Sequence, residues 1–254
     1  MMNKYLRRDQ VLDYIEANQH VSVAQICAEF DVSEATARRI LNELAQETKI
    51  ERIRGGALAV QSGSVERGYS KRSGEQSAEK ARIGKAASDL IEAGDTVFLG
   101  SGTTVSEVAY HLRDRQNLTI MTNSVAVIEI LKDAAGIQLI GLGGILWRSE
   151  QSFIGHITEQ TIAELHADKV ITGIRAIDVE KGLTNSDPMC TQTERAILGV
   201  AQQVIIVADH SKCRRVDMAF VAPLSVINTL VTDTAAPEEF VSALTAQGID
   251  VIQA

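Results

Sequence analysis

The chain has 254 residues, of which 45% are hydrophobic and 23% charged, and its formal net charge is −8. This composition is typical of a globular protein with room for one large domain, or for a small and a medium one. No apolar run approaches the roughly 18–20 residues that cross a bilayer, and the N-terminal stretch lacks the core of a signal peptide. We therefore expect a cytoplasmic protein with no membrane partner.

The three cysteines, Cys27, Cys190 and Cys213, lie far apart and show no C-x-x-C spacing. An odd number of isolated cysteines fits a reducing compartment and argues against a disulfide framework or a zinc site. We predict no metal and no cofactor.

The negative charge is unevenly spread along the chain. Residues 1–60 carry 8 Lys/Arg and 9 Asp/Glu, residues 61–82 carry 5 and 3, and residues 83–254 carry 12 and 21. The acidic excess therefore belongs to the C-terminal part. Any contact with DNA must depend on where individual arginines lie and not on bulk charge.

Three helical patterns open the chain. Residues 7–18 carry apolar side chains at helical spacing, Ser22 with Gln25 forms a capping-box signature before a second helix, and Ser33 is a good N-cap for a third. Two short helices joined by a tight turn, after a supporting helix, predict a helix-turn-helix motif.

The third helix gathers Thr36, Arg38, Arg39 and Asn42 on its polar face. The second helix of such a motif enters the major groove, where arginine binds guanine or a phosphate and threonine meets a phosphate or a thymine methyl. The alternative is a three-helix bundle with a solvated arginine pair. We favour DNA binding.

Two short extended segments flank Gly55-Gly56 and predict a β-hairpin. A hairpin beside a recognition helix, bearing Arg52 and Arg54, is the wing of a winged helix, and the alternative is a plain linker. The predicted DNA-binding residues are Ser33, Thr36, Arg38, Arg39, Asn42, Arg52 and Arg54.

From residue 95 strand and helix patterns alternate, which predicts an α/β fold with a mainly parallel sheet covered on both faces. The predicted strands are Thr96–Leu99, Leu118–Thr122, Ile137–Leu142, Lys169–Ile174, Val204–Ala208, Thr229–Thr232 and Asp250–Gln253. The helical patterns cover 79–91, 104–113, 124–133, 158–166, 191–203 and 237–247. We predict a DNA-binding domain at 1–60, a Ser- and Gly-rich linker at 61–78, and an effector and oligomerisation domain at 79–254.

The segment 96–105 runs from a buried strand through two glycines and three hydroxyl side chains into an amphipathic helix. The first backbone N–H groups and the dipole of such a helix favour an anion such as phosphate. Val105 replaces the third glycine of a dinucleotide fingerprint, and no Walker lysine follows. The alternative is an ordinary turn in which Thr103 or Thr104 caps the helix.

Other strand ends are also rich in small and polar residues, and parallel strands bring these ends to one edge of the sheet. A phosphorylated, hydroxyl-rich ligand suits that edge, with Lys212 on phosphate and Asn123 and Asp209 on hydroxyls. The alternative is a solvated lysine and two capping residues. The predicted effector-binding residues are Ser101, Gly102, Thr103, Thr104, Asn123, Ser124, Gly144, Asp209 and Lys212.

These motifs together resemble the DeoR family of bacterial transcription regulators along almost the whole chain. The N-terminal resemblance lies in Val32-Ser33-Glu34-Ala35-Thr36-Ala37-Arg38-Arg39-Ile40-Leu41-Asn42-Glu43-Leu44 and Arg54-Gly55-Gly56-Ala57. The family pattern is V-S-x-x-T-I-R-R-D-L-N-x-L, followed by H-G-G-A. Ile40 thus replaces an acid, an exchange expected to affect base reading if that acid lies near the groove.

The C-terminal resemblance is carried by Tyr69, Lys71, Lys80, Ile83, Ala86-Ala87, Gly94-Asp95-Thr96, Ser101-Gly102-Thr103-Thr104, Thr122-Asn123-Ser124, Gly143-Gly144, Gly155, Ala167-Asp168-Lys169, Gly182-Leu183-Thr184 and Asp209-His210-Ser211-Lys212. Gly100 stands where many members have aspartate. The resemblance implies a winged helix followed by a domain similar to ribose-5-phosphate isomerase. It also implies a repressor released by a sugar phosphate, commonly as a dimer or tetramer.

The sequence therefore predicts a non-enzymatic repressor of a carbohydrate or polyol catabolic operon. Its partners are double-stranded operator DNA, a phosphorylated sugar or polyol, and further copies of itself. The alternative is a sugar-phosphate isomerase with an accessory N-terminal domain, its acid and base drawn from Asp187, Glu194, Asp209 and His210. A third possibility is an activator in place of a repressor.

Overall fold

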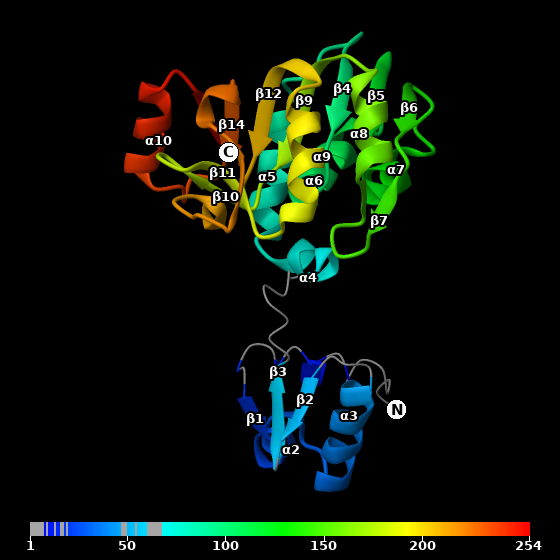
Figure 1. Cartoon of the computed structure of the whole chain (residues 1–254), viewed down its shortest axis with the longest axis vertical. Helices are drawn as coiled ribbons and strands as arrows, with labels where there is room; N and C mark the ends of the chain where they lie inside the picture. The colour runs from blue at the N-terminus through cyan, green and yellow to red at the C-terminus, as the bar shows by residue number, and fades with distance from the viewer. Residues whose placement is uncertain are drawn as a thin grey trace. The chain divides into compact units, whose positions relative to one another are not determined.

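The computed structural model describes residues 8, 10–12, 14–15, 18, 20–46, 50–53, 55–59 and 68–254. The chain divides into two compact units, Met1–Val65 and Glu66–Ala254 (Figure 1). The predicted linker, 61–78, extends into the second unit, and the exact limits of the domains stay a prediction. Among the described residues, no helix has the length and apolar character needed to cross a membrane.

Two helices of the first unit form the predicted helix-turn-helix pair: α2 (Val23–Phe30) and α3 (Glu34–Gln46). The capping box is confirmed, because the Ser22 hydroxyl accepts from the Gln25 N–H while the Gln25 side chain accepts from the Ser22 N–H. Ser33 accepts from the N–H of Thr36 at 3.3 Å and so caps α3 as expected. The described residues within 7–18 are helical, and the others lie outside the described part of the chain.

The predicted hairpin is present as β2 (Ile50–Ile53) and β3 (Gly56–Ala59). Sequence patterns missed β1 (His20–Ser22), a three-residue strand that pairs antiparallel with β3. The order β1-β3-β2 makes the three-stranded sheet of a winged helix. A strand this short has no periodicity of its own and exists only because β3 lies beside it.

The core of the first unit is formed mainly by fully buried Ile26, Leu41 and Leu44, with Val11 and Ile15 from the first helical segment. Ile40 belongs to this core and is 6% exposed. The expectation that residue 40 affects base reading is therefore not supported, because its side chain packs inward.

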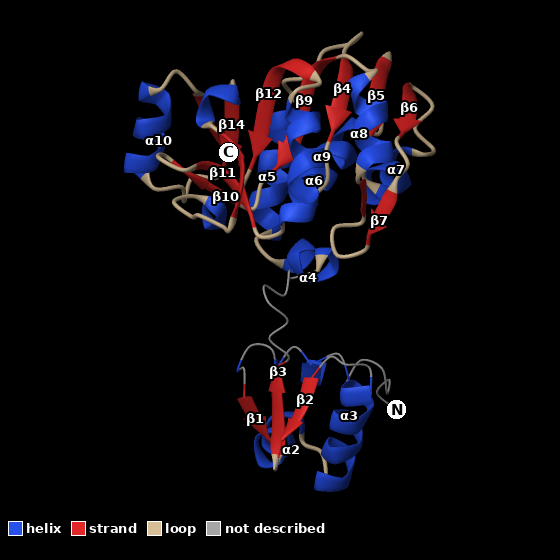
Figure 2. Ribbon diagram, viewed as in Figure 1, coloured by secondary structure: helices blue, strands red, loops and turns tan. Residues whose placement is uncertain are grey.

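The second unit is built on a seven-stranded sheet in the order β15-β14-β12-β9-β4-β5-β6 (Figure 2). Every pairing in this sheet is parallel, as predicted. The strands are β4 (Thr96–Leu99), β5 (Leu118–Thr122), β6 (Ile137–Gly141), β9 (Ala167–Gly173), β12 (Ala201–Val207), β14 (Thr229–Thr232) and β15 (Asp250–Gln253).

Successive side chains of these strands enter two separate cores. Phe98 belongs to one buried cluster, and its neighbours Val97 and Leu99 belong to the other. In the same way, Ile206 belongs to the first cluster, and its neighbours Ile205 and Val207 belong to the second. Because the period of a strand is two residues, a sheet buried on both faces needs apolar residues at every position, which explains the continuous apolar runs.

Helices cover both faces of the sheet. Their bounds are α4 (Tyr69–Gly74), α5 (Ser77–Ser88), α6 (Thr103–Leu112), α7 (Val125–Leu131), α8 (His156–Ala163), α9 (Pro188–Leu198) and α10 (Glu238–Ala246). The prediction that a helix extends over 191–203 was wrong at its end. Gly199 follows α9, and residues 201–203 already pair with β9.

Two small antiparallel sheets escaped prediction. One joins β7 (Ile145–Trp147) to β8 (Ser152–Ile154), and the other has the order β10-β11-β13. The latter strands are β10 (Ala176–Asp178), β11 (Gly182–Asn185) and β13 (Ala219–Ala222), and the short 3-10 helices His210–Lys212 and Leu224–Val226 flank β13.

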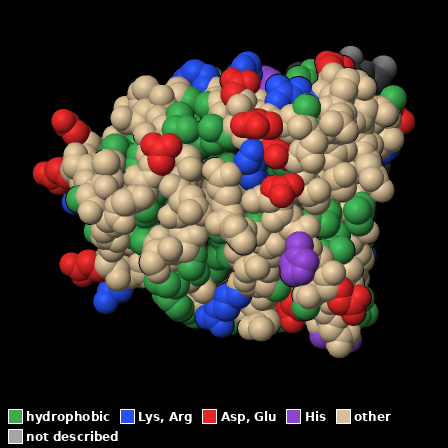
Figure 3. Space-filling model, turned by 90° about the horizontal axis from the view of Figure 1, so that it is seen from above, with side chains coloured by type: hydrophobic (Ala, Val, Ile, Leu, Met, Phe, Trp, Pro, Cys, Tyr) green, Lys and Arg blue, Asp and Glu red, His purple; other side chains and the backbone are tan. Residues whose placement is uncertain are grey.

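An ion pair and a hydrogen bond to a carboxylate lie at the edge where the parallel strands begin. Lys169 contacts Asp95 at 2.6 Å, and the Asp168 carboxylate accepts from the N–H of Thr96 at 2.8 Å. Figure 3 looks onto this end of the unit and shows acidic and basic side chains next to one another near its centre. A surface of mixed sign is not an anion site, so the opposite edge is the place to look for one.

Candidate functional site

A pocket lies at the carboxyl ends of the central parallel strands, as predicted for an open α/β sheet. The space between the atoms that line it is about 830 Å³, a figure that includes open solvent at its mouth. Seven of the nine predicted effector residues line it: Ser101, Gly102, Thr103, Thr104, Asn123, Asp209 and Lys212.

The N-terminus of α6 forms one wall of the pocket. The backbone of Gly102 has φ of 124°, a conformation that favours glycine, and turns the chain from β4 into the helix. No side chain caps this helix, so the predicted alternative in which Thr103 or Thr104 is the N-cap does not hold. Its first N–H groups are therefore left to solvent or to a ligand.

Four cationic side chains line the pocket: Arg72, Lys80, Arg175 and Lys212. Burial lowers the pKa of Lys212, and the neighbouring arginines lower it further, while Asp209 acts in the opposite direction. Burial likewise lowers the pKa of Lys80, with Lys212 and Arg72 adding to the effect against Asp209. These crowded positive charges are stabilised by an anion placed among them.

Two buried oxygen acceptors complete the site. Asp209 is 1% exposed and Asn123 is 2% exposed, and both line the pocket. One Asp209 oxygen accepts from the N–H of Ser211, and the Asn123 amide nitrogen donates to the carbonyl of Phe153. The remaining oxygens, Asp209 Oδ2 and Asn123 Oδ1, have no hydrogen-bond partner among the residues that the structure describes. A buried acceptor without a partner is costly, so hydroxyl donors of a ligand fit here.

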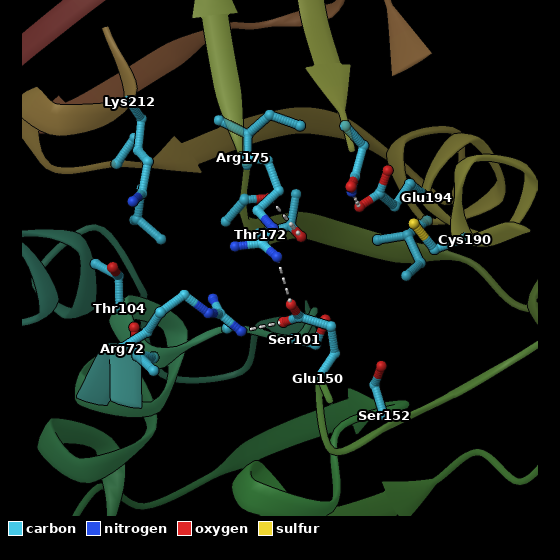
Figure 4. A pocket seen from close by; sticks show the side chains of 18 of the residues that line it. Arg72, Ser101, Thr104, Glu150, Ser152, Thr172, Arg175, Cys190, Glu194 and Lys212 are labelled. Atoms are coloured by element: carbon cyan, nitrogen blue, oxygen red, sulfur yellow. Dashed lines mark hydrogen bonds and ion pairs between the residues drawn. The ribbon is translucent and has the colours of Figure 1, made fainter. Parts of the chain in front are cut away.

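The other end of the pocket has a different character. Glu194, Cys190 and Asn185 line it, and Glu194 accepts from the Asn185 amide at 2.5 Å. Figure 4 shows Arg72 and Lys212 on one side of the pocket and Glu194 and Cys190 on the other. The site therefore has a cationic end and a mixed polar end.

Two predicted residues lie elsewhere. The Ser124 hydroxyl accepts from the N–H of Val127 and caps α7, so it serves the helix and does not line the pocket. Gly144 lies just before β7, where Thr158 and the Ile154 carbonyl would contact any added side chain. Their spacing after strand ends resembles that of pocket residues, but the loops turn these two positions toward α7 and α8.

Sequence reasoning missed much of the cationic end. Arg72 comes from α4 and Arg175 from the turn after β9, and Lys80 is 4% exposed within α5. The family resemblance includes Lys80 but assigns it no place in the pocket. Nothing in the local sequence separates the two arginines from solvated surface residues, because only the fold brings them together.

The residues proposed for an isomerase are scattered. Asp209 and Glu194 line the pocket, whereas Asp187 caps α9. The Nδ1 atom of His210 lies 2.9 Å from Oδ1 of Asp233. Among the described residues, no group of three His, Cys, Asp or Glu side chains is arranged to hold a metal ion.

The predicted DNA-reading face of α3 is accessible. Arg38, Arg39 and Asn42 are exposed, and Thr36 is half-buried. Arg38 pairs with Glu34 at 3.1 Å and Arg39 with Glu43 at 3.8 Å. Exposed pairs of this kind contribute little, so both arginines are free to exchange a carboxylate for a DNA phosphate.

The two predicted wing arginines are Arg52 and Arg54. Arg52 donates to the carbonyl of Gly56 at 2.9 Å and so closes the hairpin. Arg54 lies outside the described residues. The contact of either side chain with DNA stays a prediction.

A winged helix-turn-helix unit followed by an α/β unit with a polar, cation-lined pocket defines a DNA-binding regulator with a ligand-binding domain. Comparison with known families agrees with this class. Residues 7–63 match the DeoR-like helix-turn-helix domain, and residues 75–234 match the DeoR C terminal sensor domain.

Named relatives match the chain over most of their length. The chain is 34% identical over 229 residues to the transcriptional repressor AccR of Agrobacterium fabrum, covering 90% of this chain and 89% of that protein. It is 33% identical over 250 residues to the glycerol-3-phosphate regulon repressor of Escherichia coli K12, covering 98% and 99%. The chain belongs to the DeoR family of transcriptional regulators.

Solved structures of ribose-5-phosphate isomerase overlap part of the chain. The enzyme from Methanocaldococcus jannaschii is 19% identical and covers 53% of each chain, with a TM-score of 0.39.

Proposed function

We propose that this regulator represses a carbohydrate or polyol catabolic operon and leaves its operator when a phosphorylated sugar or polyol enters the pocket. Relatives support the direction of control, since one is named a transcriptional repressor and another a glycerol-3-phosphate regulon repressor. The proposal includes a cytoplasmic homo-oligomer, dimer or tetramer, without enzymatic activity.

The uncapped N-terminus of α6, facing a pocket with four Lys/Arg side chains, is the observation that carries the effector half of the proposal. Backbone N–H groups at a helix start and nearby cations are the usual partners of a phosphate ester. The unpartnered oxygens of Asp209 and Asn123 then accept hydrogen bonds from hydroxyl groups on the rest of the ligand. A phosphorylated polyol or sugar carries both kinds of group.

The DNA half rests on the exposed face of α3. Arg38 and Arg39 contact base edges or phosphates in the major groove, with Thr36, Ser33 and Asn42 beside them. Effector binding must stabilise one arrangement of the two units over the other, because a ligand that binds both equally shifts nothing.

The test is fluorescence polarisation of labelled DNA from upstream of the protein's own gene. Salt is titrated first, and a panel of sugar and polyol phosphates is then added to the complex, with the unphosphorylated compounds as matched controls. We expect steeply salt-dependent binding that one phosphate ester weakens and its parent polyol does not. Absence of DNA binding together with turnover of one of the esters would instead make the protein an isomerase.

A further inference from the structure

Glu150 bridges two arginines at the cationic end of the pocket. Its Oε2 contacts Arg72 Nη2 at 2.5 Å, and its Oε1 contacts Arg175 Nη2 at 3.5 Å. The three side chains are between 9% and 17% exposed, so these pairs are largely removed from solvent. Figure 4 shows the Glu150 carboxylate between the two guanidinium groups, with dashed lines to both.

The same bridge occupies a place that suits a phosphate. A guanidinium binds carboxylate and phosphate oxygens with the same planar arrangement of donors. Ser101, in the turn before α6, and Thr104, in its first turn, line the same pocket as the two arginines. A phosphate that reaches these groups therefore competes with the Glu150 carboxylate for Arg72 and Arg175.

The loop that carries Glu150 also holds α4 in place. The Ser149 carbonyl accepts from the N–H of Tyr69 at 2.8 Å, at the first residue of α4. The Ser149 hydroxyl accepts from the indole N–H of Trp147, and Arg72 reaches Glu150 from the middle of α4. Displacing Glu150 thus loosens two of the attachments of this helix.

Two further contacts keep α4 on the second unit. The Tyr69 hydroxyl and the Ser106 hydroxyl are 2.6 Å apart, and the Lys80 ammonium donates to the carbonyl of Arg72. Among the described elements, α4 is the first to follow the wing strand β3 along the chain. α4 is therefore the described element of the second unit that lies nearest along the chain to the DNA-binding unit.

We propose that Glu150 is an internal counter-ion that the effector's phosphate displaces from Arg72 and Arg175, releasing α4. The proposal rests on the proposed function and adds the residue that couples the pocket to the chain leading to the DNA-binding unit. It also restricts the ligand. A neutral sugar cannot replace a carboxylate on two arginines, so the phosphate itself is the switching group.

The test compares Glu150→Gln with the wild-type protein and with Glu194→Gln. Both substitutions remove one negative charge from the same pocket at nearly constant shape. Glu150 forms the ion pairs with Arg72 and Arg175, whereas Glu194 accepts a hydrogen bond from the Asn185 amide. Trp147 is the single tryptophan of the chain and lines the pocket, so its fluorescence reports ligand binding. Inorganic phosphate is the probe, and hydrogen exchange at residues 69–75 reports the state of α4.

We expect Glu150→Gln to bind inorganic phosphate about 5-fold more tightly or better, since the weakest couplings between sites are of that order. Without any ligand its α4 amides should exchange faster than those of the wild type. Glu194→Gln should show a smaller gain in affinity and wild-type exchange at α4.

Wild-type exchange at α4 in ligand-free Glu150→Gln would overturn the proposal, as would equal gains in affinity for the two variants. The proposed function fails on a different result, namely no response of the wild-type DNA complex to any phosphate ester. Because the exchange experiment needs no ligand, the two failures are distinguishable.

Discussion

Gly100 directly follows β4, at a point where Thr172 of the neighbouring strand β9 leaves no space for a side chain. A Cβ added there would lie 2.3 Å from the Thr172 hydroxyl oxygen and 2.8 Å from the Thr172 Cβ. Overpacking of this kind costs about 1–3 kcal/mol, and the reduced freedom of the unfolded chain returns about 0.4–1 kcal/mol. We therefore expect Gly100→Ala to lower the free energy of unfolding of the second unit by about 1–2 kcal/mol.

A double-mutant cycle isolates this contact. Thr172→Ala removes the hydroxyl but keeps the Cβ at 2.8 Å, so it should rescue Gly100→Ala only in part, whereas Thr172→Gly should rescue it fully. Urea unfolding followed by Trp147 fluorescence reports the second unit alone. Gly143→Ala is the control, because nothing lies within 4 Å of its added Cβ.

An unchanged urea midpoint for Gly100→Ala would refute the steric reasoning. It would also be refuted if Gly100→Ala lowered the free energy of unfolding as much in a Thr172→Gly protein as in the wild type. The same contact bears on aspartate, the residue that the family resemblance places at this position. An aspartate requires more room than alanine, so it would need a different partner at residue 172.

Three further predictions concern DNA, effector and pH. Arg38→Ala should abolish tight operator binding measured by polarisation while Trp147 still reports phosphate binding, and retained operator affinity would contradict the assignment of α3. Asp209→Asn should weaken the response to the sugar phosphate about 10-fold or more, while inorganic phosphate binds as well or better, because the lost oxygen accepts from hydroxyl groups. Burial raises the pKa of Asp95, but hydrogen bonds from Lys169 and the Glu92 N–H outweigh it and leave the pKa below 3.8. This contribution to stability is present above pH about 4 and is lost at lower pH. The difference in unfolding free energy between wild type and Asp95→Asn should therefore shrink on acidification. A difference that stays constant with pH would contradict this prediction.

The elements of the fold could be predicted because each is encoded by adjacent residues. All seven strands of the parallel sheet coincide with the apolar runs identified in the sequence, within a few residues at their ends. The capping box of Ser22 and Gln25 fixed the start of α2 in the same way. Burial on both faces demands apolar residues at every strand position, and that demand is visible without knowing what packs against them.

Part of the pocket was predictable for a topological reason. Parallel strands end at one edge, so small and polar residues after β4, β5 and β12 must gather there. That rule located Ser101–Thr104, Asn123 and Asp209. It failed for Ser124 and Gly144, because a residue after a strand end can equally cap the next helix or pack against it.

The antiparallel sheets and the charge arrangement depended on tertiary structure. The short strands β1 and β13 gain their hydrogen bonds from partners that are distant in sequence, and three or four residues carry no periodic signal.

By itself the sequence determined which segments form strands and helices, and which strand ends offer hydroxyls and backbone N–H groups. Only the tertiary structure decided that Glu150 lies between Arg72 and Arg175, which are separated from it by 78 and 25 positions in the chain. The physical reason is the range of each interaction. Backbone periodicity is set by neighbours along the chain, whereas an ion pair forms between whichever charges the folded chain buries together.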